Sequence, residues 1–313
     1  TGMDKGMIRK TYFIIFYFIG LIAFSGVVMA EGDASISIGS IDAVYDIRIN
    51  GMPVVKNKSI QSRSLLVPID IYLKEGENEV QVNFLGAYQK DDKIIRELSE
   101  KALIQLAIKL AGKRYGLVEI KRKDQVAFVK LKSNDGREVR VGDEFKSEKS
   151  IFYAGSVPEK STLISFVIFI ENFDTEDVYW LDGEKIDESD FDKLKDAYID
   201  AYNYIQNDKG VEYMKKLTPY YKSIADFYYD WTFEETIKDL SRHFKKNDQD
   251  GAVLKKPDFS NVKMEILAGG LLSRFIYSPL AWDKNGKIGR LNIAFKKVNG
   301  KFEPVFISND YSF

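Results

Sequence analysis

The chain has 313 residues, of which 45% are hydrophobic and 30% are charged, and its formal net charge is -1. This length and composition are typical of a globular protein with room for two domains, and they exclude a largely disordered chain. The lack of a basic excess gives no electrostatic signal for nucleic acid, so we exclude that class of partner. Cysteine is absent, which excludes disulfides, thiol nucleophiles and thiolate metal sites.

The first thirty residues have the pattern of a secretory signal peptide. Arg9 and Lys10 precede an uncharged apolar run from Tyr12 to Val28, and small residues up to Ala30 match a signal-peptidase site. We expect cleavage after Ala30 and a periplasmic or secreted mature chain, which suits a bacterial protein without disulfides. The apolar run approaches the length that spans a bilayer, so the alternative is an anchor that is not cleaved.

Residues 31–172 predict an antiparallel β-sandwich. Apolar residues alternate from Ser35 to Phe84, and Asn50-Gly51 between two such runs predicts a two-residue hairpin turn, because both positions need a positive φ. The string from Val67 to Val80 resembles a segment common in small extracellular β-sandwich modules. This resemblance implies that its loop hydrogen-bonds across the sheet edge, and it carries no chemistry.

One part of this region departs from the strand pattern. At about residues 92–112 the apolar residues fall at helical spacing and Gly112 follows, which predicts an amphipathic helix inserted in the sandwich or laid against it. Its basic residues favour a solvated face, with a membrane-surface role as the alternative. Strands are expected again over Leu117–Lys132, and a turn follows them at 134–137. A buried central strand is expected over Leu163–Ile170.

The next segment, 173–188, is acidic, and it predicts a solvated linker without the ligand spacing of a calcium site. A helix is then expected from Ser189 or Asp190 to Ile205, followed by helices that Pro219 interrupts. From Val262 to Ile307 the pattern predicts consecutive antiparallel strands joined by tight turns. The region 189–313 is therefore expected to pack helices on a curved antiparallel sheet, and the whole chain to be α+β.

This order of elements, together with Ser278-Pro279 and Asn299-Gly300-Lys301-Phe302, resembles the cone-shaped fold of the nuclear-transport-factor-2-like (NTF2-like) and cystatin-like superfamilies. The resemblance covers residues 189–313 and no diagnostic motif accompanies it. It implies a sheet that curls around the helices and often leaves a pocket. Members of this fold include isomerases, dehydratases, binding modules and inhibitors, so the resemblance alone decides no function.

Few residues offer catalytic chemistry. His243 is the only histidine, which excludes a multi-histidine metal site. It is a candidate general base in the pocket, although its place near a helix end favours a solvated role. Asp226 and Asp230 lie among aromatic residues, and their carboxylates are candidate general bases in the cone. We predict no metal site and no cofactor, because Asp248-Gln249-Asp250-Gly251 matches a calcium loop only in part and no phosphate-binding glycine loop is present.

Aromatic and arginine side chains of the C-terminal region are candidate ligand-binding residues, because they combine an apolar body with a polar tip. These candidates are Tyr228, Trp231, Arg274, Tyr277, Trp282 and Arg290. Core packing is the competing interpretation of each of them.

The functional hypothesis is an exported, non-catalytic binding or interaction protein of the bacterial cell envelope. Its ligand would be a protein or an envelope glycan, and one version is an inhibitor or immunity protein. The alternative is an enzyme of the lyase or isomerase type that uses a carboxylate in the cone. A third hypothesis, a structural role at the membrane, requires that the apolar N-terminal segment is retained.

Overall fold

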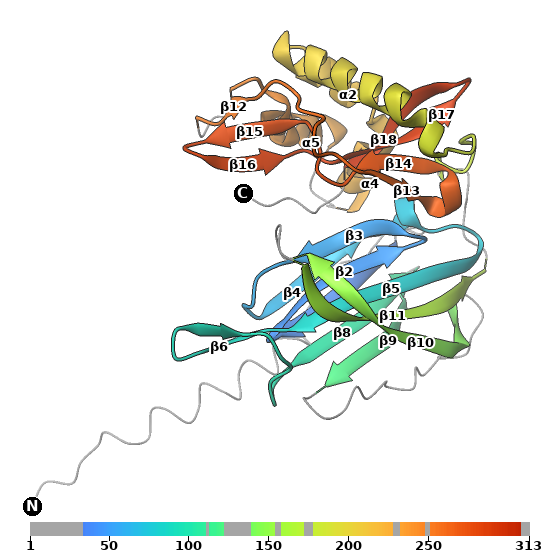
Figure 1. Cartoon of the computed structure of the whole chain (residues 1–313). Helices are drawn as coiled ribbons and strands as arrows, with labels where there is room; N and C mark the ends of the chain where they lie inside the picture. The colour runs from blue at the N-terminus through green and yellow to red at the C-terminus, as the bar shows by residue number, and fades with distance from the viewer. Residues whose placement is uncertain are drawn as a thin grey trace, which may run out of the picture.

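The computed structural model describes residues 34–110, 113–121, 139–153, 158–171, 178–227, 232–247 and 251–307. These residues form a mixed α+β protein with several antiparallel sheets (Figure 1). The described residues up to 171 are built of strands and are called the N-terminal unit. Those from 178 on contain the α-helices and the remaining sheets, and they are called the C-terminal unit. The α+β class expected from the sequence is confirmed.

Two sheets make up most of the N-terminal unit, and every pairing in them is antiparallel. The first has the order β4-β1-β8-β9, with β1 (Ala34–Ile41), β4 (Arg63–Pro68), β8 (Leu103–Leu110) and β9 (Lys113–Lys121). The second has the order β10-β11-β5-β2-β3, with β2 (Ala43–Ile49), β3 (Met52–Asn57), β5 (Gly76–Gly86), β10 (Val139–Tyr153) and β11 (Pro158–Ile170). A 3-10 turn, η1 (Asp70–Tyr72), precedes β5, and β6 (Tyr88–Lys90) pairs with β7 (Lys93–Ile95).

Alternation of side chains explains why the two sheets share one hydrophobic core. Residues two apart on each strand point to the same face, and Ile36 and Ile38 of β1 join Val80 and Val82 of β5 in one buried cluster. The predicted hairpin turn is confirmed, because β2 and β3 pair around Asn50 and Gly51, whose φ angles are 52° and 74°.

The helix predicted at about 92–112 is wrong. The structure places β7 and β8 there, and β8 pairs with β1 on one side and β9 on the other. Ile104, Leu106 and Ile108 recur every second residue and are buried, so the segment satisfies a strand period as well as a helical one. Partners distant in sequence supply the backbone hydrogen bonds of β8, and this tertiary pairing overrides the local pattern.

The later strands of the N-terminal unit follow the sequence in part. The strand expected over Leu117–Lys132 begins as β9, whereas 122–138, with the predicted turn at 134–137, lie outside the described residues. The buried strand expected over Leu163–Ile170 is confirmed as part of β11, which lies between β10 and β5. Its Ile164, Phe166 and Ile168 are buried.

The C-terminal unit begins with helices and ends with two sheets. The helices are α2 (Phe191–Gln206), α3 (Gly210–Lys215), α4 (Thr218–Phe227) and α5 (Phe233–Leu240), with 3-10 turns η2 (Glu188–Asp190) and η3 (Ser241–Phe244). One sheet is β12-β15-β16, with β12 (Val253–Leu254), β15 (Ala281–Lys284) and β16 (Lys287–Arg290). The other is β13-β14-β17-β18, with β13 (Met264–Leu267), η4 (Ala268–Gly270), β14 (Leu272–Phe275), β17 (Ile293–Val298) and β18 (Lys301–Ile307). The strands expected from 262 to 307 are therefore present but form two sheets, not one.

Local chemistry sets the ends of these helices. Asp187 and Asp190 form a capping box at the start of the η2–α2 segment, which satisfies backbone N–H groups that a helix start leaves unpaired. Pro219 is the second residue of α4, where its missing N–H costs little. Between α2 and the four-stranded sheet, the Tyr198 ring packs 5.1 Å from Phe275 and 5.0 Å from Phe295, measured between ring centroids.

The acidic segment expected to be a solvated linker is packed where the structure describes it. Val178, Trp180 and Ile186 are buried, and the backbone N–H of Glu184 donates to the carbonyl of Lys297 over 2.8 Å. The ammonium of Lys296 binds both carboxylate oxygens of Asp182 at 2.8 and 3.0 Å. Residues 178–188 are thus held against β17 by apolar burial and by charge-assisted hydrogen bonds.

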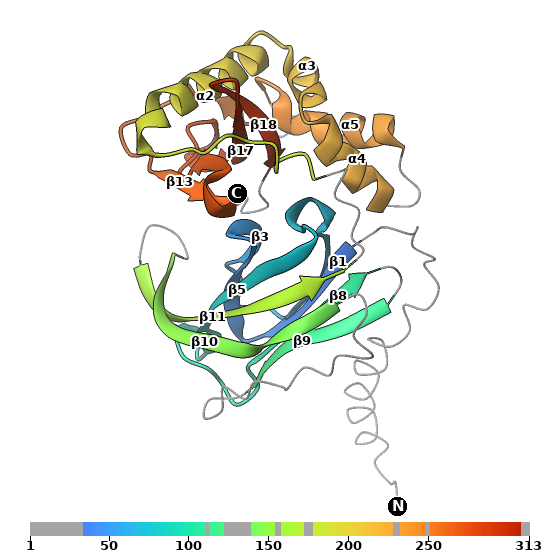
Figure 2. The same ribbon diagram turned by 90° about the vertical axis from the view of Figure 1, so that its right-hand side faces the viewer.

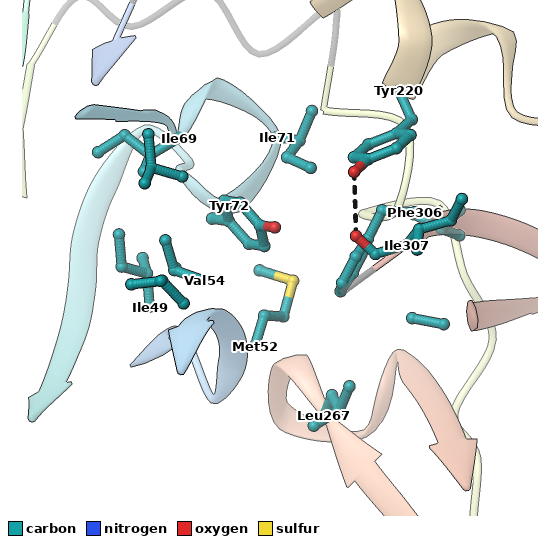
Figure 3. Close-up of a cluster of buried hydrophobic side chains, with 14 of the residues drawn as sticks. Ile49, Met52, Val54, Ile69, Ile71, Tyr72, Tyr220, Leu267, Phe306 and Ile307 are labelled. Carbon is teal, nitrogen blue, oxygen red and sulfur yellow. Dashed lines mark hydrogen bonds between the residues drawn. The ribbon is translucent and has the colours of Figure 1, made fainter. Parts of the chain in front are cut away.

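The two units meet across an apolar junction. Figure 2 shows the helices and sheets of the C-terminal unit stacked on one end of the N-terminal unit. At the junction, Met52 and Tyr72 lie opposite Leu267 and Phe306 (Figure 3), and the rings of Tyr72 and Phe306 meet edge to face with centroids 5.4 Å apart. One hydrophobic cluster contains buried residues of both units, so we expect them to unfold together.

None of the described helices is long and apolar enough to cross a bilayer.

A candidate binding cleft between the two units

A partly open hollow of about 430 Å³ lies where the two units meet. The N-terminal unit contributes the turn between β2 and β3, the loop before β5 and the start of β5. The C-terminal unit contributes η4, the residue after it and the segment that contains Trp180. Its lining residues are Asn50, Gly51, Lys74, Glu77, Glu79, Trp180, Leu181, Lys185, Ala268, Gly269 and Leu271. This volume lies in the range of small-molecule and peptide side-chain pockets. We call it the cleft.

The buried side chain of Asn78 organises the N-terminal wall of the cleft. Its Oδ1 accepts from the backbone N–H of Lys74 at 2.9 Å, and its Nδ2 donates to the carbonyls of Lys74 at 2.8 Å and Gly76 at 3.1 Å. The Nδ2 of Asn50 donates to Oδ1 of Asn78 and to the carbonyl of Tyr72, both at 2.8 Å. These bonds join the β2–β3 turn to the loop before β5.

The opposite wall is the left-handed backbone of η4. Ala268, Gly269 and Gly270 have φ angles of 50°, 61° and 98°, and a side chain added at Gly269 would point into open space. The Nζ of Lys185 donates to the carbonyl of Gly269 at 2.7 Å, and the N–H of Ile186 donates to that of Gly270 at 2.8 Å. The chain is therefore fixed where its backbone borders the cleft.

Trp180 and Leu181 provide the apolar floor. Trp180 is only 2% exposed, and its Nε1 donates to the carbonyl of Ile71 at 2.7 Å. Leu181 is 39% exposed, which is unusual for leucine and leaves apolar surface available to a ligand. The tryptophan anchors the floor to both units, while the leucine supplies the free surface.

An ion-pair chain joins the units beside the cleft. Arg48 of β2 binds Oε1 of Glu265 at 2.7 Å, and Arg274 of β14 binds Oε2 of the same carboxylate at 2.7 Å. Arg48 also lies 3.4 Å from Asp46. The Arg274 side chain is 2% exposed and that of Glu265 is 15% exposed, so this chain of charges is shielded from water.

The charged groups of the ion-pair chain shift the pKa values of Glu265 and Arg48. Burial alone would raise the pKa of Glu265, but the positive charges of Arg274 and Arg48 outweigh it and hold that pKa below its ordinary value. Burial alone would lower the pKa of Arg48, but the negative charges of Asp46 and Glu265 outweigh it and raise that pKa. Glu265 and Arg48 are therefore charged at neutral pH, and their contact joins the two units electrostatically.

The lining of the cleft combines charged groups with apolar surface. Its charged lining groups are two ammonium groups, Lys74 and Lys185, and two carboxylates, Glu77 and Glu79, and the lining contains no hydroxyl, thiol or imidazole side chain. A lining of this kind can orient a ligand by charge and by apolar contact, but it offers no activated nucleophile. Within the described ranges, no group of three or more His, Asp or Glu side chains is placed to hold a metal ion.

The candidate ligand-binding residues that the structure describes do not line the cleft. Arg274 belongs to the ion-pair chain, and Trp282 is buried with its Nε1 donating to the carbonyl of Lys245 at 2.8 Å. Tyr277 is 42% exposed, and Arg290 donates to the carbonyl of the adjacent Ser278 at 2.6 Å. Tyr228 and Trp231 lie outside the described residues.

For the candidate catalytic residues, the structure describes the backbone position at most. Asp226 lies in α4 and His243 in η3, but their side chains are outside the described part of the structure, as is the whole of Asp230.

Sequence reasoning missed the residues that build the cleft. Arg48 and Glu265 are 217 positions apart, and no local pattern indicates that they pair. Trp180 offered a signal, because a large aromatic residue in an acidic segment suggests that the segment is packed. Comparison of the chain with protein-family models, with curated proteins and with solved structures found no match.

Proposed function

We propose that this chain is an exported binding protein of the bacterial cell envelope that holds a peptide segment of a protein partner in the cleft. The observation that carries the proposal is the cleft itself, where an apolar floor lies between ammonium and carboxylate groups on a rigid junction. A peptide carries both charges and apolar side chains, so this lining is complementary to it. An inhibitor or immunity protein is one form that this function would take.

A peptide fits the cleft better than a glycan does. Sugar rings bind well against exposed aromatic faces, and the one aromatic residue of the lining, Trp180, is buried and bonded through its Nε1. The free surface is instead that of Leu181 and of backbone at Gly269, which suits a side chain and an extended main chain. The experiment described below therefore treats glycan binding as the competing result.

Export is part of the proposal and is supported by the pattern of residues 1–30 with its cleavage site after Ala30. The finer fold description is likewise proposed. Two antiparallel sheets around one core support a β-sandwich-like module for the N-terminal unit. The order of helices and strands supports an NTF2-like or cystatin-like relationship for the C-terminal unit.

The enzymatic alternative receives no support from the described part of the C-terminal unit. The space between α2 and the four-stranded sheet, where a cone would leave its pocket, is occupied by the rings of Tyr198, Phe275 and Phe295. A carboxylate that acts as a general base needs room for substrate within hydrogen-bond reach.

The test is selection of peptides from a displayed random library on the mature chain, followed by affinity measurement by fluorescence polarisation. Replacing Glu77 and Glu79, both exposed, by lysine reverses the carboxylate side of the cleft. We expect selected peptides to bind this variant at least about tenfold more weakly, because two surface charge contacts become repulsive.

The matched control is the double variant Glu100→Lys and Glu212→Lys, which changes the same number of exposed charges away from the cleft. It should bind the peptides as the native chain does. Selection of no peptide, or equal affinity for the cleft variant and the control, would overturn the proposal. Binding of glycans on an array, lost in the cleft variant, would keep the cleft and replace its ligand class.

A further inference from the structure

The β6–β7 hairpin, residues 88–95, projects from the N-terminal unit and is called the arm. Its two strands pair with each other and with no other described strand. Asp91 and Asp92 join them, with φ angles of 47° and 60°, as a two-residue turn, which is the tightest common hairpin connection. In Figure 1, the arm lies at the left of the N-terminal unit, whereas β13, which leads into the η4 wall of the cleft, lies at the right. The tip of the arm can therefore meet such a cleft only in another copy of the chain.

The base of the arm is fixed to the unit that carries it. An ideal Cβ at Gly86 would lie 2.2 Å from the backbone nitrogen of Leu98, so only a glycine lets the chain entering the arm pass this close to the chain leaving it. Arg96, just after β7, binds the carboxylate of Glu159 in β11 at 3.1 Å. Because the base is already held in place, the arm loses little conformational freedom when its tip binds a partner.

The tip of the arm presents charges of both signs and apolar surface. Asp91 and Asp92 stand at its end, and Lys90 and Lys93 are paired directly behind them, with all four residues exposed. Ile94 follows and is 53% exposed, more than any other large hydrophobic residue in the described part of the chain. From its end backwards, the tip thus offers two carboxylates, two ammonium groups and one aliphatic side chain.

The lining of the cleft offers the opposite groups. One ammonium group belongs to each wall, Lys74 to the N-terminal unit and Lys185 to the C-terminal unit, so a pair of carboxylates that enters between the walls meets a positive charge on both sides. Glu77 and Glu79 are exposed at the start of β5 and can receive the ammonium groups that follow. The exposed Leu181 supplies the apolar surface for an aliphatic side chain.

We propose that the cleft of one chain receives the tip of the arm of a second copy of the chain. The carboxylates of the turn meet the ammonium groups of the two walls, the lysines of the arm meet the carboxylates of β5, and Ile94 packs on Leu181. The contact rests on the proposed function, because the tip would be the peptide segment that the cleft holds. Arm and cleft are different surfaces, so copies join head to tail into rings or open chains and not into symmetric dimers.

Sedimentation equilibrium of the mature chain measures this self-association. We expect assemblies larger than a dimer as the chain concentration rises, and weaker association as salt is added. The arm variant, Asp91→Asn with Asp92→Gly, removes both carboxylates and keeps the hairpin, because Asn-Gly is a favoured sequence for a two-residue turn. It should associate about tenfold more weakly than the native chain, since two charge contacts are lost.

A mixing experiment tests whether the two surfaces are different. The cleft variant, Glu77→Lys with Glu79→Lys, keeps a native arm, whereas the arm variant keeps a native cleft. Each variant alone should associate weakly, but their mixture should form one-to-one complexes that grow no further, because one matching pair of surfaces remains. The control Asp196→Asn with Glu212→Gln removes two exposed carboxylates from α2 and α3 and should associate as the native chain does.

The outcomes separate self-association from peptide binding in general. A chain that stays monomeric although selected peptides bind its cleft would overturn the arm contact and leave the proposed function standing. A monomeric chain that also selects no peptide would overturn both. Association that the arm variant retains or that the control loses would overturn the arm contact, and so would two variants that fail to pair when they are mixed.

Discussion

Removing the carboxylate of Glu265 is the sharpest perturbation of the junction. Glu265→Gln keeps the shape of the side chain but leaves Arg48 and Arg274 without the charge that lies 2.7 Å from each. Breaking a shielded ion pair by removing one partner costs about 3–5 kcal/mol, because a charge stays buried without compensation. Arg48 is 27% exposed and keeps its contact with Asp46, so we expect a loss of about 3 kcal/mol in the free energy of unfolding.

Urea unfolding followed by circular dichroism measures this loss as a lower midpoint at unchanged slope. A matched control is Glu303→Gln, which removes an exposed carboxylate on β18 and should change stability by less than about 0.5 kcal/mol. A triple replacement, Arg48→Met and Arg274→Met with Glu265→Leu, should recover part of the loss, since an apolar cluster needs no charge compensation. A loss below about 1 kcal/mol for Glu265→Gln would show that the ion-pair chain does not join the units.

Three other perturbations have defined outcomes. The pKa of Glu265 is lower in the folded protein than its ordinary value, so its ionised form stabilises the fold above the ordinary pKa. This contribution is lost as the pH falls through the folded-state pKa. Glu265→Gln should therefore flatten the acid side of a plot of unfolding free energy against pH. Asn78→Ala should cost about 2–3 kcal/mol, because several buried backbone groups lose their partner, with thermal unfolding as the assay. Gly210→Ala should lower the free energy of unfolding by at least about 2 kcal/mol in the same assay, because the added Cβ would lie 1.9 Å from the carbonyl oxygen of Phe244. Unchanged stability would contradict this packing.

Features with local causes were predictable from the sequence. Asn50, Asn285 and Asn299 each precede a glycine, and their φ angles of 52°, 53° and 50° are those that two-residue turns require. The long helix α2 was predicted nearly to its ends, because its apolar spacing and its capping residues lie within a few positions of each other. Such features need no information from elsewhere in the chain.

Features decided by distant partners were not predictable. The segment of β8 fits both a helical and a strand period, and its state follows from pairing with β1, about seventy positions earlier in the chain. The last strands were expected in one sheet, but β15 pairs with β12 and β16, whereas β17 pairs with β14 and β18. Pairing choices of this kind depend on side-chain packing across the whole unit.

The cleft is one of the features that distant partners decide. Lys74 was expected in a loop, Glu79 in the strand after it and Lys185 in an acidic segment, but nothing local indicated that they face one cleft. Their assembly depends on the apolar junction around Met52, and on the Arg48–Glu265 contact between units. A site made by two units is a property of their packing, and charge patterns along one segment do not reveal it.

Photo-crosslinking from the floor of the cleft tests peptide binding most directly. A benzophenone amino acid placed at Leu181 should capture a selected peptide, because that side chain is exposed within the lining. The same group placed at Val211, which is 45% exposed on α3 and does not line the cleft, should capture none. Crosslinks from Leu181 that disappear with excess unlabelled peptide are the predicted result. Equal capture at Val211, or none at Leu181 by a chain that binds the peptide, would contradict the assignment of the cleft.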